Sequence, residues 1–457
     1  MKKTAVTNRE EMFRSMPVSK AMWTLCLPNI LSMLTGVLYN LVDMYFIGKI
    51  GDPNQVAAVS LCGPLFMALM GFGNVFGIGG GAYLARSMGE GAHERVKKIS
   101  SFCFWTALGI GVISGVLILS FIDPLMKVFG TSKNTVKFAH DYTLVIGISA
   151  PIMVLNYVLS NLVRSEGGAK ETMIGQMMGT VINIILDPIM IFVFNMGVVG
   201  AAIATVIGNL CANIYFALYV IFKSKTQSIA PKLYNASWKN MALPILVVGV
   251  PASLSNIMTS FANLILNNKL VAYGDVVIAG LGVSMKVYSI CMMVLIAIAF
   301  GIQPLMAYNY GARNQARFKE ALRYTAIVQI IFGTGAGLLI EIFAGPLVRF
   351  FMDNPDVVRY GRYILRVNCA SAPFLGVLYL LTNLFQSMGK GLPSLIVSLS
   401  RQGLVYIPVL LVMSLMGLYG ALWAQPAADL ISFIMAIVIY LMVTKKDKNW
   451  NQTSLEA

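Results

Sequence analysis

The segment PNILSMLTGVLYNLVDMYFIGKIGD, from Pro28 to Asp52, has a second copy in this chain. The copy reads PASLSNIMTSFANLILNNKLVAYGD, runs from Pro251 to Asp275, and is offset by 223 residues at both ends. Two further pairs keep nearly this offset, GEGAHERVKK from Gly89 with GARNQARFKE from Gly311 (222) and MGVVGAAIA from Met196 with MGLYGALWA from Met416 (220). Since the matching pieces are spread along the chain and keep their spacing, the sequence predicts two related halves.

The composition of the chain places both halves in a membrane. Of its 457 residues, 57% are hydrophobic and 12% are charged, whereas soluble domains carry about 25% charged residues. So few charges cannot cover a water-exposed surface, which excludes a soluble enzyme or a nucleic-acid-binding protein despite the net charge of +15. The six cysteines are scattered singly, so neither a disulfide framework nor a zinc site is expected.

Twelve apolar runs reach the length of about 20 residues that a helix needs to cross a bilayer. They are 21–48, 56–85, 100–122, 138–163, 172–194, 198–222, 241–270, 277–308, 322–345, 358–386, 394–416 and 418–444. Six runs per half make this a parallel repeat about an axis along the membrane normal. We therefore predict an all-α polytopic membrane protein with twelve transmembrane helices in two pseudo-symmetric six-helix bundles. These are lobes 1–222 and 240–457, joined by a basic cytoplasmic linker at 223–239.

Lysine and arginine predict the orientation of these spans, because cytoplasmic loops carry an excess of both. The segments on the side of the N-terminus are rich in them, whereas the loops near Met196 and Met416 have no charge, and the loop at 349–366 is an exception. Examples are Lys2, Lys3, Arg86, Arg95, Lys223, Lys445 and Lys448. Both termini are therefore expected in the cytoplasm, in a multi-pass protein of the cell membrane. Residues 1–23 lack the features of a cleaved signal peptide.

Four polar residues within the predicted spans form a candidate cation-coupling site, since ionisable groups in a bilayer are costly. Asp43 lies in the first span, Asn183 and Asp187 share a helical face of the fifth, and Thr205 lies in the sixth. At about 1.5 Å per residue, all four are expected at a similar depth in the outer half of the N-terminal lobe. Two carboxylates, an amide oxygen and a hydroxyl suit either Na⁺ or a proton held by a carboxylate pair. Alternatively, each packs singly, and Asp187-Pro188 is a helix kink.

The C-terminal half does not repeat this chemistry. At the aligned positions, Asp43 becomes Leu266, Asp187 becomes Ile407 and Thr205 becomes Gln425. A structural role common to both halves would keep the acids in both. We therefore expect the acidic chemistry to be confined to the N-terminal lobe.

Other polar or polarizable residues are weaker candidates. Tyr39 and Asn40 lie near the face of Asp43, where hydrogen bonding and plain helix packing explain them equally well. Candidates for a substrate cavity are Asn40, Asn156, Asn161, Gln176, Met177 and Met258. Flexible thioethers suit a wall that accepts many ligands, although a single methionine is also ordinary core or lipid-facing material. Lys286, in the eighth span, either snorkels to the interface or faces the cleft.

Five motifs resemble, in order and spacing, those of the multidrug and toxic compound extrusion (MATE) family. They are LPNILSMLTGVLYNLVDMYFIGKIG, SNLVRSEGGAKETM, VINIILDPIMIF, GVVGAAIATVIGN and GIQPLMAYNYGARN. The resemblance covers nearly the whole chain and is strongest to the MepA-like, DinF-related bacterial branch. It implies cation-driven export of bulky drugs and a coupling site at Asp43, Asn183, Asp187 and Thr205, with Tyr39 nearby. The NorM branch carries acids in C-terminal spans that lack them here, so its residues are not carried over.

The leading hypothesis is a secondary active multidrug efflux antiporter that exports lipophilic, mostly cationic drugs in exchange for H⁺ or Na⁺. Its expected partners are lipophilic cations, dyes and fluoroquinolone-like compounds, together with membrane lipid; a monomer is expected, and no nucleic acid. Two close aspartates slightly favour H⁺, while the Asn183 and Thr205 oxygens can complete a Na⁺ site. The alternative is a lipid or lipid-linked saccharide flippase of related architecture, which should have a more basic cleft. Neither an enzyme nor a cofactor is expected.

Overall fold

The computed structural model describes residues 8–447, apart from the side chains of residues 256 and 257. Within these residues every regular element is a helix, which confirms the predicted all-α fold. Eleven of the described helices are long and apolar enough to cross a membrane, and a bent pair, counted as one span, makes twelve. The two chain ends, with Lys2, Lys3 and Lys448 of the charge argument, lie outside the described residues.

The long helices follow from the apolar runs, because a backbone in lipid must satisfy its hydrogen bonds internally. The turns between them follow from local signals. Asp52 accepts a hydrogen bond from the backbone of Asn54 at the start of α3, and Asn354 caps α13 in the same way. In both helices a proline comes first, where its missing N–H costs nothing.

Internal contacts divide the chain into two units, which are described separately. Unit 1 contains the chain up to Glu10 and Leu31–Gly249, and unit 2 contains Glu11–Ile30 and the chain from Val250 onward. Three helices contribute to both units, namely α1 (Asn8–Arg14), α2 (Val18–Lys49) and α10 (Leu243–Val271). The predicted lobes 1–222 and 240–457 follow the sequence repeat and remain a prediction.

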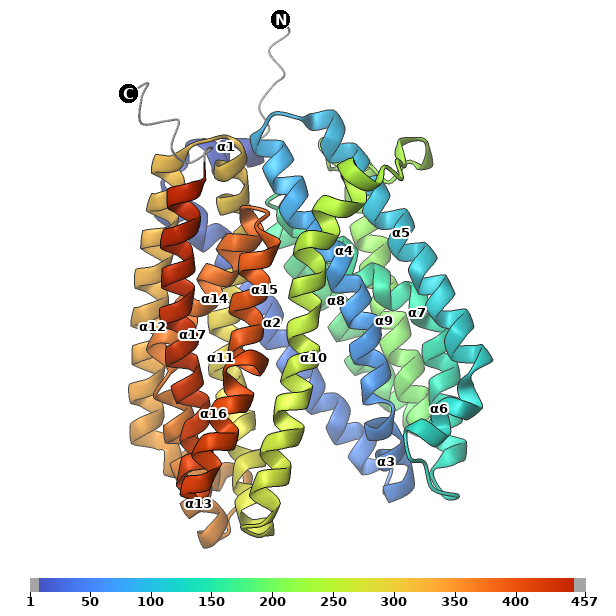
Figure 1. Cartoon of the computed structure of the whole chain (residues 1–457). Coiled ribbons are helices and arrows are strands. Elements are labelled where there is room, and N and C mark those ends of the chain that lie inside the picture. Colours follow the sequence, from blue (N-terminus) through green and yellow to red (C-terminus); the bar gives the residue numbers. More distant parts are fainter. Residues whose placement is uncertain (1–7, 448–457) are drawn as a thin grey trace, which may run out of the picture. The chain divides into compact units, whose positions relative to one another are not determined.

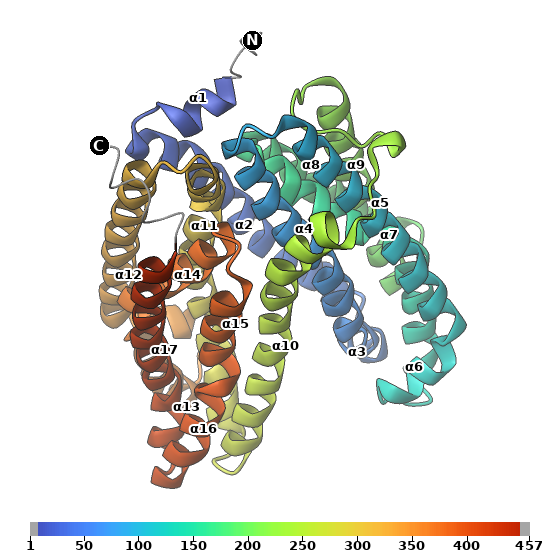
Figure 2. The same ribbon diagram turned by 45° about the horizontal axis from the view of Figure 1, so that its top comes forward.

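Unit 1 is built around α7, which contacts α4, α5, α8 and α9 (Figures 1 and 2). Its own elements are α3 (Pro53–Leu61), α4 (Gly63–Gly89), α5 (His93–Ser120), α6 (Ile122–Val128), α7 (Val136–Ser165), α8 (Ala169–Pro188), η1 (Ile189–Val193), α9 (Gly197–Phe222), η2 (Pro231–Leu233) and η3 (Trp238–Ala242). Glycines in α4 allow a close crossing with the start of α10. A Cβ atom at Gly79 would lie 2.2 Å from the carbonyl oxygen of Ile245, and one at Gly249 would lie 1.9 Å from that of Val75.

Unit 2 is built around α11, which is buried over most of its length and contacts α12, α13 and α14. Its own elements are α11 (Asp275–Gly311), α12 (Gln315–Phe351), α13 (Pro355–Cys369), α14 (Ala372–Ser387), α15 (Gly391–Leu399), η4 (Ser400–Leu404), α16 (Tyr406–Met413), η5 (Ser414–Met416) and α17 (Leu418–Lys446). Two of its spans are irregular. The tenth bends by 49° between α13 and α14, and the eleventh contains the π-helix η4 between α15 and α16 (Figure 1).

The first span of each half passes from one unit to the other. The beginning of α2 belongs to unit 2, where Asn29 Nδ2 donates to the Ala297 carbonyl at 2.6 Å and Cys26 Sγ lies 3.4 Å from the Ile298 carbonyl. The rest of α2, from Leu31, belongs to unit 1. In the reverse sense, α10 begins in unit 1 and continues in unit 2 from Val250.

Candidate functional site

Three helices of unit 1 carry the predicted coupling residues. The second part of α2 presents Tyr39 and Asp43, one turn apart, and α8 presents Asn183 and Asp187 in the same way. Thr205 comes from α9, which packs along α8. The i, i+4 spacing on α2 and on α8 therefore aims both pairs at one level of the unit.

Hydrogen bonds join four of these five residues. The hydroxyl groups of Tyr39 and Thr205 lie 3.0 Å apart. Asn183 Nδ2 donates to Thr205 Oγ1 at 3.2 Å and to Asp187 Oδ1 at 3.4 Å. The structure thus brings Tyr39, Thr205, Asn183 and Asp187 into one continuous chain that links α2, α9 and α8.

Three oxygen atoms of this site remain without a hydrogen-bond partner among the described residues: Asp43 Oδ1, Asp187 Oδ2 and Asn183 Oδ1. All three atoms are buried, and the whole Asp187 residue has no exposed surface. Asp43 is also close enough to Asp187 for an electrostatic interaction between the two carboxylates. Buried acceptors that lack a donor are costly, so the site is suited to take up a proton or a hard monovalent cation.

Three of the predicted cavity residues, Asn156, Gln176 and Asn161, are already hydrogen-bonded within the protein. Asn156 accepts a hydrogen bond from Gln176 Nε2 at 3.1 Å and donates to Asn213 Oδ1 at 3.2 Å. Asn213, which sequence reasoning missed, then donates to the Ile152 carbonyl at 2.7 Å. This network holds α7, α8 and α9 together, and Gln176 stands at its half-buried end.

Asn161 is also bound within the protein. Its amide nitrogen donates to the Tyr157 carbonyl at 2.6 Å, and its amide oxygen accepts a hydrogen bond from Arg164.

The other predicted cavity residues are dispersed. Asn40 is exposed on α2 and donates to the Gly36 carbonyl, and Met177 is exposed on α8. Met258 belongs to unit 2, where it faces Gly403 of η4. Lys286 is exposed on α11. The structure therefore does not gather the six cavity candidates at one place within a single unit.

A buried ion pair in unit 2 contradicts the expectation that acidic chemistry is confined to the N-terminal half. Arg401 Nε of η4 lies 3.0 Å from Asp429 Oδ1 of α17, and Asp429 is 1% exposed. Ser371 Oγ, at the bend between α13 and α14, donates to Asp429 Oδ2 at 2.7 Å, and Gln425 Nε2 donates to Oδ1 at 2.9 Å. Arg401 also stacks over the Tyr379 ring at 4.9 Å and bonds to its hydroxyl.

The two acidic sites differ in chemistry. Asp429 has a cation and two further donors, so both of its oxygens are satisfied. Asp43 and Asp187 each keep an oxygen without a donor in the described chain. The ion pair in unit 2 is therefore satisfied within the protein, whereas the site in unit 1 keeps buried oxygens that can still accept a proton or a cation. Arg401 and Asp429 are charged residues inside predicted spans, and that signal alone marks them in the sequence. They do not stand at the positions that align with Asp43 and Asp187, so the comparison of the two halves missed them.

The fold and these buried polar groups define a polytopic helical membrane protein of the transporter class. The family model of MatE matches residues 28–189 and 251–412, one stretch in each half. The chain belongs to the MatE family, a family of transporters and not of enzymes, which confirms both the predicted family and the expectation that no enzyme is present.

Known relatives extend over nearly the whole chain. It is 33% identical over 434 residues to the multidrug export protein MepA of Staphylococcus aureus (strain MSSA476), covering 94% of this chain and 95% of the relative. MepA of Staphylococcus haemolyticus (strain JCSC1435) is 33% identical over 431 residues, or 94% of each chain.

Solved structures share the fold. A crystal structure of MATE in complex with MaL6 superposes with a TM-score of 0.90 at 24% identity, over 96% of this chain and 99% of that one. A MOP superfamily transporter from Pyrococcus furiosus Vc1 (DSM3638) gives a TM-score of 0.89 at 24% identity, over 97% and 100%.

Proposed function

We propose that this protein is a secondary active multidrug exporter that moves lipophilic, mostly cationic drugs outward in exchange for an inward-moving cation. Its family membership and the names of its MepA relatives support drug export. The observation that carries the coupling mechanism is the set of unpartnered oxygens on Asp43, Asp187 and Asn183. Expected substrates are lipophilic cations, dyes and fluoroquinolone-like compounds.

Asp43 and Asp187 would receive the coupling cation. A protonated Asp187 could donate a hydrogen bond from its new O–H group to Asn183 Oδ1, which has no donor at present. The existing bond from Asn183 Nδ2 to Asp187 would weaken, because a neutral carboxyl group is a poorer acceptor. That change would pass through Thr205 to Tyr39 on α2, since these side chains are joined by hydrogen bonds. The cation can move the conformational equilibrium only by binding one state more tightly than another.

A cationic drug and the coupling ion would compete for the same two carboxylates. Uptake of the ion would then lower the affinity for the drug and favour its release, and the coupling would be reciprocal. Na⁺ would use the carboxylate, amide and hydroxyl oxygens directly. We place H⁺ slightly ahead, because the site has two acids, and within residues 8–447 no third acid, histidine or cysteine joins them in a group that could hold a metal ion.

The same proposal includes the setting of the protein: a monomer in the cell membrane, with both termini in the cytoplasm. The flippase alternative finds no support in the buried contacts of unit 2, because Arg401, a cation that could hold a pyrophosphate, is paired with Asp429.

Substitution of the two carboxylates tests the proposal. Asp43→Asn and Asp187→Asn should each abolish ethidium efflux from a pump-deficient host while the amount of protein in the membrane is retained. Asp141→Asn, which removes an exposed carboxylate near the start of α7, is the matched control and should leave efflux unchanged. Normal efflux by both site variants would contradict the proposal.

Proteoliposomes with separate pH and Na⁺ gradients identify the ion. Drug movement driven by a pH gradient at fixed Na⁺ is expected. If an inward Na⁺ gradient at fixed pH drives transport and a pH gradient does not, the preference for H⁺ is wrong.

A further inference from the structure

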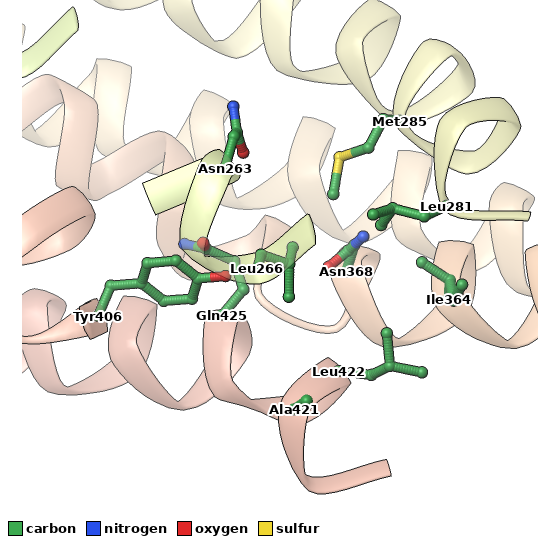
Figure 3. A pocket seen from close by; sticks show the side chains of 10 residues that line it. All are labelled: Asn263, Leu266, Leu281, Met285, Ile364, Asn368, Tyr406, Ala421, Leu422 and Gln425. Atoms are coloured by element: carbon green, nitrogen blue, oxygen red, sulfur yellow. The ribbon is translucent and has the colours of Figure 1, made fainter. Parts of the chain in front are cut away.

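Unit 2 contains a small, partly open cavity between α10, α11, α13, α16 and α17 (Figure 3). About 20 Å³ of it is open to the centre of a water molecule, which is enough for roughly one water. The residues on its wall that matter here are Asn263, Leu266, Asn368, Tyr406, Ala421 and Gln425. The rest of the wall is apolar.

The repeat places this cavity where the coupling site lies in the other half. Leu266 aligns with Asp43, and Gln425 aligns with Thr205, at the offsets of 223 and 220 that the repeat sets. Asn263 aligns with Asn40 at 223. The C-terminal half thus has amides where the N-terminal half has Asn40 and Thr205, and a leucine where it has the Asp43 carboxylate.

One wall residue has an unmet hydrogen-bonding requirement. Asn368 is 4% exposed, and none of the described residues offers its Nδ2 an acceptor. Figure 3 shows its amide on the cavity wall, with the oxygen on the side of Gln425 and Tyr406 and the nitrogen toward Leu281. A buried amide donor of this kind is normally bonded to protein or to ordered water.

We propose that the cavity is a hydration site that binds a single water molecule. The water accepts a hydrogen bond from Asn368 Nδ2, and the other polar groups on the wall, on Asn263, Tyr406 and Gln425, are those that can complete the two to four partners that buried waters have. A metal cation fits less well, because Leu266 removes the carboxylate and Asn368 presents a donor. An apolar ligand would leave the Asn368 donor without an acceptor.

The water would extend the polar cluster around Asp429. Gln425 already donates to Asp429, and Asp429 holds Ser371 at the helix bend and Arg401 in the π-helix. Irregular backbone at membrane depth is tolerated where it is buried in protein or lines a hydrated cavity. The hydration site therefore belongs to the structural support of the two irregular spans, and it is independent of the drug and ion coupling proposed for unit 1.

Radiolytic hydroxyl labelling in ¹⁸O water tests the site in the full-length protein, because radicals formed from a bound water oxidise side chains next to it. Tyr406 is 2% exposed, yet it should be labelled at millisecond exposure. Met306, which has no exposed surface and does not line the cavity, is the internal reference and should stay unlabelled despite its more reactive sulfur.

Two variants locate the water. Asn368→Leu removes its donor and Ala421→Val fills its space, and each should reduce labelling of Tyr406 to the level of Met306. Asn383→Leu is the matched control, since Asn383 is equally buried on α14 but outside the cavity, and it should leave Tyr406 labelled. The proposal is overturned if Tyr406 is unlabelled in the native protein, or if its labelling survives both cavity variants. Either variant alone decides the question if the other does not fold.

Discussion

The ion pair between Arg401 and Asp429 should contribute more to the stability of unit 2 than any single surface contact. Asp429→Leu would leave the Arg401 charge buried and would remove the acceptor of Ser371 and Gln425. Removing one partner of a buried pair costs about 3–5 kcal/mol. For a unit of this size, 1 kcal/mol corresponds to about 2–4 °C, so the unfolding temperature should fall by about 6–20 °C.

The chain carries its own reporter for this measurement. Its six cysteines are free, five of them are buried, and Cys211 is half-buried. A thiol-reactive fluorophore added to the purified protein therefore reports unfolding as the buried thiols become accessible. Asp353→Asn, at an exposed ion pair with Arg349, is the control and should leave the unfolding temperature unchanged.

A double variant separates the effect of the two charges from the effect of the volume that the two side chains fill. Arg401→Met combined with Asp429→Leu removes both charges and keeps apolar volume, which in buried pairs is often neutral or stabilising. The double variant should recover most of the stability that Asp429→Leu loses, a coupling that a double-mutant cycle measures. If Asp429→Leu unfolds at the native temperature, or if the two losses simply add, the pair does not stabilise unit 2.

Three further outcomes are expected. Thr205→Val should lower drug efflux about thirtyfold, because it cuts two hydrogen bonds of about 1 kcal/mol each and about 1.4 kcal/mol corresponds to a factor of ten, while Thr205→Ser should keep efflux near the native level in the same cell assay. Gly79→Ala should destabilise unit 1 by about 1–3 kcal/mol in a thermal unfolding experiment, because the added methyl group would clash with the Ile245 carbonyl. Gly71→Ala is the control and should leave the stability unchanged, because the space around its Cβ position is open. Burial raises the pKa of Glu166, in the loop after α7, and Arg9 opposes that rise, so Arg9→Gln should raise this pKa further. A raised folded-state pKa makes the contribution of Glu166 to stability decline as pH rises through it, so Arg9→Gln should lower the unfolding temperature at pH 7.5 and much less at pH 5. Equal losses at both pH values would contradict this, and Arg95→Gln, paired with exposed Glu90, is the control.

The spans were predictable because bilayer thickness imposes a length on apolar runs, and the structure places helices on all twelve. The bend in the tenth span was not predicted, although Pro373 stands at the start of α14, where proline often opens a helix. The π-helix at Ser400–Leu404 has no comparable sequence signal. Within it, Arg401 packs against Asp429 and Tyr379, two contacts between helices that the sequence alone does not reveal.

The proposed coupling residues could be placed at one depth from their spacing, but the hydrogen bonds between them could not be predicted. Periodicity shows that Asn183 and Asp187 share a face, whereas the bond from Asn183 to Thr205 depends on how α8 and α9 pack. The same limit applies to Asn156, which looked like a cavity residue and instead bonds to Gln176 and Asn213. The hydrogen-bond partners of side chains on neighbouring helices depend on rotamers and on how the helices cross. Neither can be inferred from the periodicity of a single sequence.

The exchange of the first spans has a consequence for dividing the chain into fragments. A cut in the segment 223–239 separates the halves of the repeat but removes from each packing unit a piece of its own interior. The N-terminal fragment would lack the start of α10, whose Ile245 carbonyl packs on Gly79. The C-terminal fragment would lack Asn29, which bonds to the carbonyl of Ala297. Neither fragment should fold when produced alone, whereas fragments produced together should reassemble, so the halves depend on reciprocal exchange of helices more than on the peptide that connects them.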